Sequence, residues 1–192
     1  MTRLDDLESL EPSDRDELRA WLEVNHHSSP GVWLAVGKKG GRLTNLRYDD
    51  AVEEALAFGW IDSTTRALDD DRFRILFTPR KAKSTWARSN KERVKRLTDA
   101  GLMAEAGLAA VATAKANGSW SQLDDIDALI VPTNLTAALS ADIEAEKHFG
   151  AMSDSAKRQV LYWIASAKRA ETRERRITRT VAALREGKSP VG

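Results

Sequence analysis

The chain has 192 residues, of which 42% are hydrophobic and 31% charged, and its formal net charge is +1. This composition is typical of a globular protein with a hydrophobic core, and it excludes the class of highly charged, weakly hydrophobic disordered chains. The absence of cysteine excludes disulfide bonds, thiol nucleophiles, thiolate zinc sites and iron–sulfur clusters.

The first part of the chain mixes helix and strand patterns. Ser13 is expected to cap a first helix, whose buried stripe contains Leu18 and Leu22 at a spacing of four. Residues 32–36 predict a strand, and the glycines and lysines that follow predict a turn. Residues 48–58 predict a second helix, which Gly59 ends.

A β-hairpin is expected next, made of residues 61–68 and 72–78 and separated by three aspartates. Phe73, Ile75 and Phe77 alternate with polar residues, which is the pattern of a strand with one buried face. The rest of the chain is predicted to be helical, with helices over residues 90–101, 103–116, 134–140 and 141–149, one capped by Ser153, and one that ends before Gly187.

Strands that cluster early and helices that cluster late predict an α+β fold. We expect a small antiparallel sheet of three to four strands packed with helices, followed by a helical C-terminal part. The expected boundaries are an α+β core domain over residues 1–120, a connector over 121–132, and a helical region over 133–192 that packs on the core.

Five phrases in the chain carry a resemblance to one family. They are LEVNHHSSPGVWLAVGKKG (22–40), YDDAVEEALAFGWIDS (48–63), FTPRKAKSTWARSNKERVKRL (77–97), NGSW (117–120) and WIASAKRAETRERRI (163–177). They occur in order over nearly the whole chain, and they resemble the YdeI/OmpD-associated (OmdA) family, also called bacteriocin-protection proteins. The resemblance implies a link to tolerance of bacteriocins or antimicrobial peptides and no particular reaction. It also draws attention to Lys168, Glu171, Arg173 and Arg176 in the last phrase.

Positive charge is concentrated in residues 80–97, which carry +7, whereas residues 1–79 carry −6 and residues 98–154 carry −7. Such segregation predicts a positive surface, and therefore an anionic ligand. The candidate ligand-binding residues lie at the ends of the hairpin and in the segment that follows it: Trp60, Asp62, Arg80, Lys83, Ser84, Trp86 and Asn90. If the strands pair, Asp62 and Arg80 share one end of the hairpin, close to a helix N-terminus that favours phosphate or carboxylate groups.

The alternative for these residues is structural, with Asp62 and Arg80 as a buried ion pair and Trp86 as core packing. Of the six tryptophans, Trp86 and Trp120 are the two expected to be partly exposed.

A second hypothesis assigns the basic segment to nucleic acid. Its patch residues are Lys81, Arg88, Lys91, Arg93, Lys95 and Arg96. Basic side chains would cover the outer face of a helix, with Trp86 available for stacking. A solvated face, or a helix that docks on acidic residues, gives the same pattern, and no nucleic-acid-binding motif is present.

A third hypothesis is an enzyme that acts on a small anionic substrate with Asp62 as general base. No pairing of a nucleophile with a base supports it, so no catalytic residue is assigned. The three histidines lack metal-ligand spacing, and neither a metal nor a cofactor is expected.

We therefore expect a non-catalytic binding protein whose partner is an unknown small anion or a protein. No run of 18 apolar residues occurs, so membrane insertion is not expected. The first 18 residues are acidic and lack the apolar segment of a secretory signal, and a cytoplasmic location is expected.

Overall fold

The computed structural model describes residues 4–41 and 43–191. Its chain divides into two compact units, Met1–Ser121 and Gln122–Gly192. Each unit has its own cluster of buried hydrophobic side chains, and no residue belongs to both clusters.

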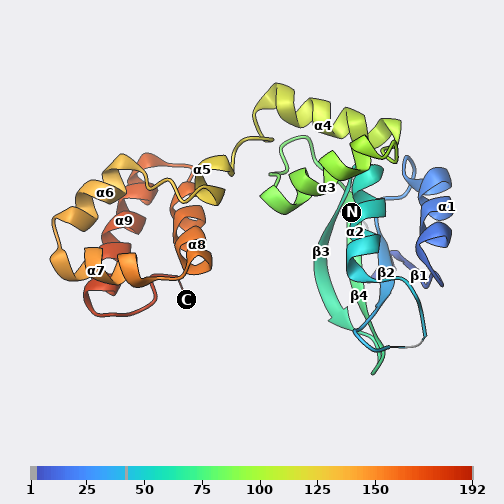
Figure 1. Ribbon diagram of the computed structural model, residues 1–192, viewed down its shortest axis with the longest axis horizontal. Helices are drawn as coiled ribbons and strands as arrows, with labels where there is room; N and C mark the ends of the chain where they lie inside the picture. The colour runs from blue at the N-terminus through green and yellow to red at the C-terminus, as the bar shows by residue number, and fades with distance from the viewer. Residues whose placement is uncertain (1–3, 42, 192) are drawn as a thin grey trace. The chain divides into compact units, whose positions relative to one another are not determined.

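The first unit holds a four-stranded sheet and four α-helices among its described residues (Figure 1). In chain order its elements are η1 (Leu4–Asp6), β1 (Glu8–Leu10), α1 (Arg15–Asn25), β2 (Val32–Gly37), α2 (Tyr48–Ala57), β3 (Trp60–Ala67), β4 (Arg72–Pro79), α3 (Arg88–Asp99) and α4 (Glu105–Asn117). The strands are arranged in the order β1-β2-β4-β3. The predicted α+β class is confirmed.

Most of the sheet is antiparallel, as expected, but its edge is not. Strands β3 and β4 form the predicted hairpin, and β2 pairs antiparallel with β4. Strand β1 adds to β2 in parallel, with Glu8 opposite Val32, so the sheet is mixed. The sequence did not predict β1, because three residues are too few to show an alternating pattern.

Both faces of β2 are covered, which explains why all six of its residues are buried. Val32, Leu34 and Val36 belong to the core shared with the helices. Trp33 lies on the other face, where the guanidinium groups of Arg66 and Arg74 lie 4.7 and 4.9 Å from its ring centroid.

A buried carboxylate joins α1 to α2. Glu54 is only 2% exposed, and it accepts hydrogen bonds from Arg15 at 2.5 Å and from Arg19 at 3.0 Å. Because both arginines come from α1, this ion pair fixes how the two helices pack.

Helix α4 approaches the end of α2 at a glycine. A Cβ atom added at Gly107 would lie 2.1 Å from the carbonyl oxygen of Ala57. The amide of Ala104, just before α4, donates to the same oxygen at 3.1 Å. The close packing of the two backbones therefore requires glycine at position 107.

The second unit is all helical in its described part. It contains α5 (Asp124–Asp127), α6 (Thr133–Ser140), α7 (Ile143–Ala151), α8 (Asp154–Ala165) and α9 (Ala170–Arg185). Leu135, Phe149, Ile164 and Ile177 contribute to its core from four different helices. Ser153 caps α8 as predicted, accepting a hydrogen bond from the amide of Ala156.

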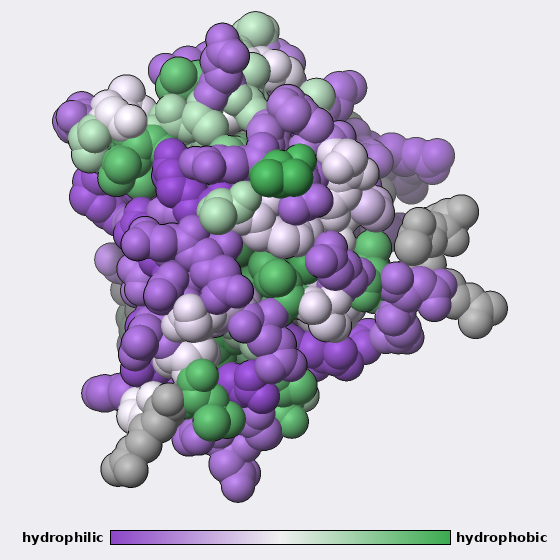
Figure 2. Space-filling model, turned by 90° about the vertical axis from the view of Figure 1, so that its right-hand side faces the viewer, coloured by the Kyte–Doolittle hydropathy of each residue, from purple (hydrophilic) through white to green (hydrophobic). Residues whose placement is uncertain are grey.

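The outer surface is mainly polar. Figure 2 shows one face of the molecule, on which hydrophilic side chains predominate and hydrophobic ones form small separate groups. No broad apolar patch of the kind that marks an obligate protein interface is visible on this face. No helix in the described ranges has both the length and the apolar character needed to cross a membrane.

Candidate functional site

The hairpin brings the two ends of the predicted site together. Trp60 lies opposite Pro79, and Asp62 lies opposite Phe77. The amide of Arg80 then donates to the carbonyl of Gly59 at 2.9 Å. Asp62 and Arg80 therefore share the end of the hairpin away from its turn, as the sequence predicted, and α3 and α4 lie at this end (Figure 1).

Arg80 is a cation that the fold leaves incompletely satisfied. Its guanidinium lies 3.9 Å from the ring centroid of Trp86, and its Nη1 donates to the carbonyl of Thr85 at 3.2 Å. Its Nε is buried without a hydrogen-bond partner, and no carboxylate of the described residues forms an ion pair with it. Burial lowers the pKa of Arg80 to about 10, and the nearby charge of Asp62 opposes this shift only in part.

Trp86 forms the floor under Arg80. The expectation that Trp86 is partly exposed is wrong, because only 2% of it is exposed. Its ring packs against Trp120 with centroids 5.0 Å apart. The segment 117–120, which contains Trp120, also contacts the loop after Arg80. Asn117 donates to the carbonyl of Ala82 at 2.6 Å, and Ser119 donates to the same oxygen. These hydrogen bonds therefore fix the loop that follows Arg80.

Sequence reasoning missed Tyr48, the first residue of α2. Its hydroxyl donates to the Asp62 carboxylate at 2.9 Å. Burial first, and then this hydrogen bond and the charge of Asp62, raise the pKa of Tyr48 to about 12. Tyr48 and Asp62 are 14 residues apart and lie in different elements, so no local sequence pattern indicates that their side chains meet.

Replacing Asp62 with asparagine should lower the pKa of Tyr48 towards its ordinary value near 10. Folding favours the neutral phenol of Tyr48, because its pKa is higher in the folded protein than in the unfolded chain. The part of the folding free energy that depends on the neutral phenol is therefore present below pH 10 and is lost as the pH rises towards 12. The chain has only two tyrosines, so a Tyr162→Phe background leaves Tyr48 as the single phenol for absorbance titration at alkaline pH. An unchanged pKa of Tyr48 in Asp62→Asn would show that the negative charge of Asp62 does not act on the phenol.

The other predicted residues lie around this centre in different ways. Trp60 is 1% exposed and packs edge-to-face against Trp21, with centroids 5.9 Å apart, so it is a packing residue here. Lys83 is exposed and Ser84 is half-buried on the loop that follows Arg80. Asn90 accepts a hydrogen bond from Arg93 at 3.5 Å within α3. Asp62, Arg80 and Trp86 are therefore the predicted residues that come together.

Carboxylates pair with much of the basic patch. Arg93 pairs with Asp49 at 2.6 Å and Arg96 pairs with Glu53 at 2.8 Å, both acids on α2. Within α3, Arg88 pairs with Glu92 and Lys95 with Asp99. Lys91 lies 5.5 Å from the ring centroid of Trp120. Lys81 is exposed on the loop after Arg80. Helix α3 therefore docks much of its charge on α2 instead of presenting it all to solvent.

Metal ligands do not converge in the described part of the chain. Among residues 4–41 and 43–191, no group of three or more His, Asp or Glu side chains could hold a metal ion.

Comparison with known proteins divides the chain much as the structure does. Residues 10–110 match the family model described as a domain of unknown function (DUF8412). Residues 128–187 match the model described as bacteriocin-protection, YdeI or OmpD-associated, called OmdA. No curated protein and no solved structure matches the chain. Tyr48, Asp62, Arg80 and Trp86 fall within the first match, whereas the OmdA match lies in the helical second unit.

Proposed function

We propose that this chain, which belongs to the DUF8412 family and carries an OmdA domain at residues 128–187, is a non-catalytic binding protein with a small-anion site at Arg80. The observation that carries the proposal is the buried, unpartnered Nε of Arg80. A buried polar group without a partner costs free energy, and a buried charge without a counter-ion costs more. An anion that reaches the Arg80 guanidinium would offset the cost of its buried charge.

The surroundings of Arg80 suit an oxyanion. Stacking on Trp86 holds the guanidinium plane in place, so that its remaining N–H groups keep a fixed direction. A carboxylate or phosphate group can accept two parallel hydrogen bonds from such a fork. In this proposal Lys83, Ser84 and Asn90 add charge and hydrogen bonds at the rim, while Trp60 and Trp86 support the site from within.

Two other functions have less support from the geometry. The ion pairs of α3 with α2 neutralise cations that nucleic-acid phosphates would need. For an enzyme with Asp62 as base, the carboxylate already accepts a hydrogen bond from Tyr48. Nucleic-acid binding keeps a sharp test, because it requires affinity that falls steeply as salt rises.

Replacing Arg80 with methionine tests the anion site. We expect the thermal stability of the ligand-free protein to stay within about 1 kcal/mol of the parent, because a buried charge is replaced by an apolar chain of similar length. In the parent, an added anion should raise the unfolding temperature of the first unit, and this rise should disappear in Arg80→Met. The measurement is thermal unfolding with inorganic phosphate, succinate and a nucleoside monophosphate at constant ionic strength. Tryptophan fluorescence monitors the transition in a Trp163→Phe background, in which all remaining tryptophans belong to the first unit.

Lys81→Met is the matched control, since it removes the same charge from the neighbouring exposed position. It should leave the anion-dependent stabilisation in place. A loss of several kcal/mol in ligand-free Arg80→Met would instead identify Arg80 and Asp62 as a structural pair. Equal anion effects in the parent and in Arg80→Met would refute the site.

The proposed biological role comes from the name of the matched family. The OmdA description names bacteriocin protection, and a small-ligand sensor would serve such a role indirectly, through a stress-related anion or a protein partner. A cytoplasmic location stays a prediction, which cell fractionation with an antibody against the chain would test.

A further inference from the structure

The second unit contains a cavity lined mainly by arginine. It measures about 330 Å³, and its lining residues are Trp163, Thr172, Arg175, Arg176 and Arg179. Trp163 comes from α8 and the other four residues come from α9. The lining contains no carboxylate. This cavity lies in the OmdA match, in a different unit from Arg80.

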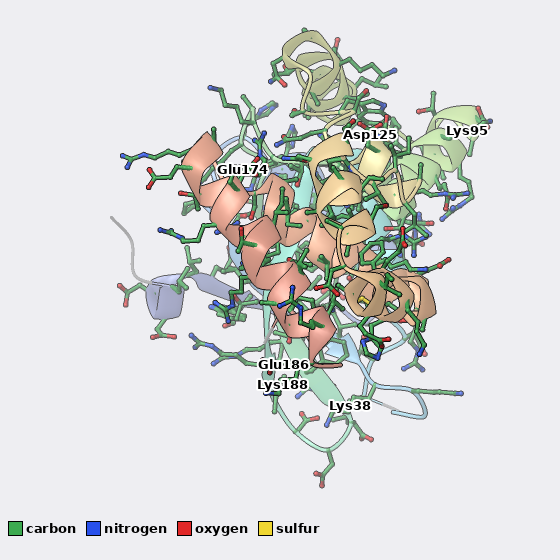
Figure 3. The ribbon with its side chains drawn as sticks, turned by 90° about the vertical axis from the view of Figure 1, so that its left-hand side faces the viewer. Lys38, Lys95, Asp125, Glu174, Glu186 and Lys188 are labelled. Carbon is green, nitrogen blue, oxygen red and sulfur yellow. The ribbon has the colours of Figure 1, made fainter. Side chains whose placement is uncertain are left out.

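Helical spacing explains why these side chains meet. Thr172, Arg175 and Arg179 are three and four residues apart and therefore occupy one face of α9, with Arg176 beside them. Thr172 lies in the first turn, where the helix dipole favours negative charge. In Figure 3, the labelled Glu174 lies along α9, away from the end marked by Glu186 and Lys188.

Arg176 has a structural role in the cavity wall. Its Nη1 donates to the carbonyl of Trp163 and, at 2.8 Å, to the hydroxyl of Ser166. Its guanidinium lies 5.1 Å from the ring centroid of Trp163. These contacts tie the start of α9 to the end of α8, so Arg176 shapes the site and is not its freest cation.

Arg175 and Arg179 carry the binding potential. Neither forms an ion pair with a carboxylate of the described residues, and Arg179 lies 5.6 Å from the Trp163 ring centroid. Among the acids of α9, Glu171 stands four residues before Arg175, but no ion pair joins the two in the described part of the chain. Glu174 accepts a hydrogen bond from the side-chain amide of Asn134 at 2.9 Å. Three guanidinium groups thus line one cavity that has no carboxylate in its lining, so the cavity carries a local excess of positive charge.

We propose that this cavity is a binding site for a phosphate group, with Arg175 and Arg179 as the ligand-contacting cations and Thr172 as a hydroxyl donor. A phosphate carries up to two negative charges and accepts paired hydrogen bonds from guanidinium groups. A single carboxylate would neutralise only one of the three cations. The phosphate is either inorganic or part of a small phosphomonoester, and both present the same group.

Titration calorimetry on the full chain tests the site, with inorganic phosphate, glycerol phosphate and acetate as probes at constant ionic strength. We expect phosphate or its ester to bind, and acetate to bind at least about tenfold more weakly. Arg175→Gln and Arg179→Gln should each weaken phosphate binding about tenfold or more, since charge-assisted hydrogen bonds are the strong ones. Both positions are exposed, so the fold should tolerate the changes, and thermal unfolding without phosphate checks this.

Lys168→Gln is the matched control, because it removes one charge from the loop before α9 without changing the cavity lining. It should change phosphate affinity less than about twofold, as expected for a screened surface charge. If Lys168→Gln and Arg175→Gln weakened phosphate affinity equally, the effect would be general charge attraction and the proposal would be overturned. The absence of phosphate binding to the parent would also overturn it.

The two anion sites can be tested apart. Arg80→Met should leave phosphate binding at α9 intact, and the indole N–H signal of Trp163 should still shift on phosphate addition in a nuclear magnetic resonance spectrum. If Arg80→Met abolished that shift, the site at α9 would be refuted while the site at Arg80 would stand.

Discussion

Glu54→Gln is expected to lower the free energy of unfolding of the first unit by about 3 kcal/mol or more. The change removes the negative charge from a side chain that is 2% exposed, and it leaves Arg15 and Arg19 without their shared counter-ion. Arg15 and Arg19 are partly exposed and keep pairs with Glu53 and Glu23. The loss is still large, because two charge-assisted hydrogen bonds to a buried carboxylate disappear. Urea unfolding, followed by fluorescence in a Trp163→Phe background, measures the loss.

Glu23→Gln provides the control on the same network. Glu23 also pairs with Arg19, at 3.5 Å, but its side chain is 59% exposed. Solvent-exposed pairs contribute little, so the loss should stay below about 1 kcal/mol. If the two substitutions cost the same, water must reach Glu54, and the described burial of the pair would be wrong.

Gly107→Ala is expected to destabilise the first unit by about 2 kcal/mol or more, although alanine is the better helix former by about 1 kcal/mol. The added Cβ would lie 2.1 Å from the carbonyl oxygen of Ala57 and 2.7 Å from its carbon, both backbone atoms. Only a displacement of α4 can relieve such a clash, and that displacement would also lengthen the hydrogen bond from Ala104. Thermal or urea unfolding measures the change.

Gly150 is the contrasting position, because it also lies in a helix and a Cβ added there meets nothing within 4 Å. Gly150→Ala should therefore stabilise the second unit by about 0.5–1 kcal/mol through the lower entropy of its unfolded chain. Opposite signs at the two glycines would confirm that steric contact, and not helix propensity, decides at Gly107. A stabilising Gly107→Ala would contradict the packing of α4 on α2.

Much of the fold follows from local patterns. The alternation of Phe73, Ile75 and Phe77 predicts β4 correctly, and Gly59 ends α2 in the left-handed conformation that favours glycine. The first helix begins one residue later than expected, because Asp14 and not Ser13 receives the capping hydrogen bond from Glu17. Strand β1 stayed hidden, since its pairing with β2 depends on contacts 24 residues apart.

The site was harder to predict, because its key properties depend on burial. Local spacing places Asp62 and Arg80 at one end of the hairpin, but it cannot tell that Trp86 is covered or that Tyr48 reaches Asp62. One signal was readable. Glu54 lies three residues after Ala51 and four before Phe58, on the buried face of α2, and an acid on such a face requires a cationic partner.

The pairing of α3 with α2 also sets the range over which this molecule can attract a ligand. The first unit contains the strongly basic segment, yet Asp49 and Glu53 meet Arg93 and Arg96 across the helix interface. Opposite charges a few ångströms apart cancel at distances beyond about 10 Å, the screening length at moderate salt. Long-range steering of anions is therefore weak, and association rates should depend little on ionic strength. The affinity of Arg80 for an anion would then depend on short-range terms, namely the direction of its N–H groups and the cost of removing water from them.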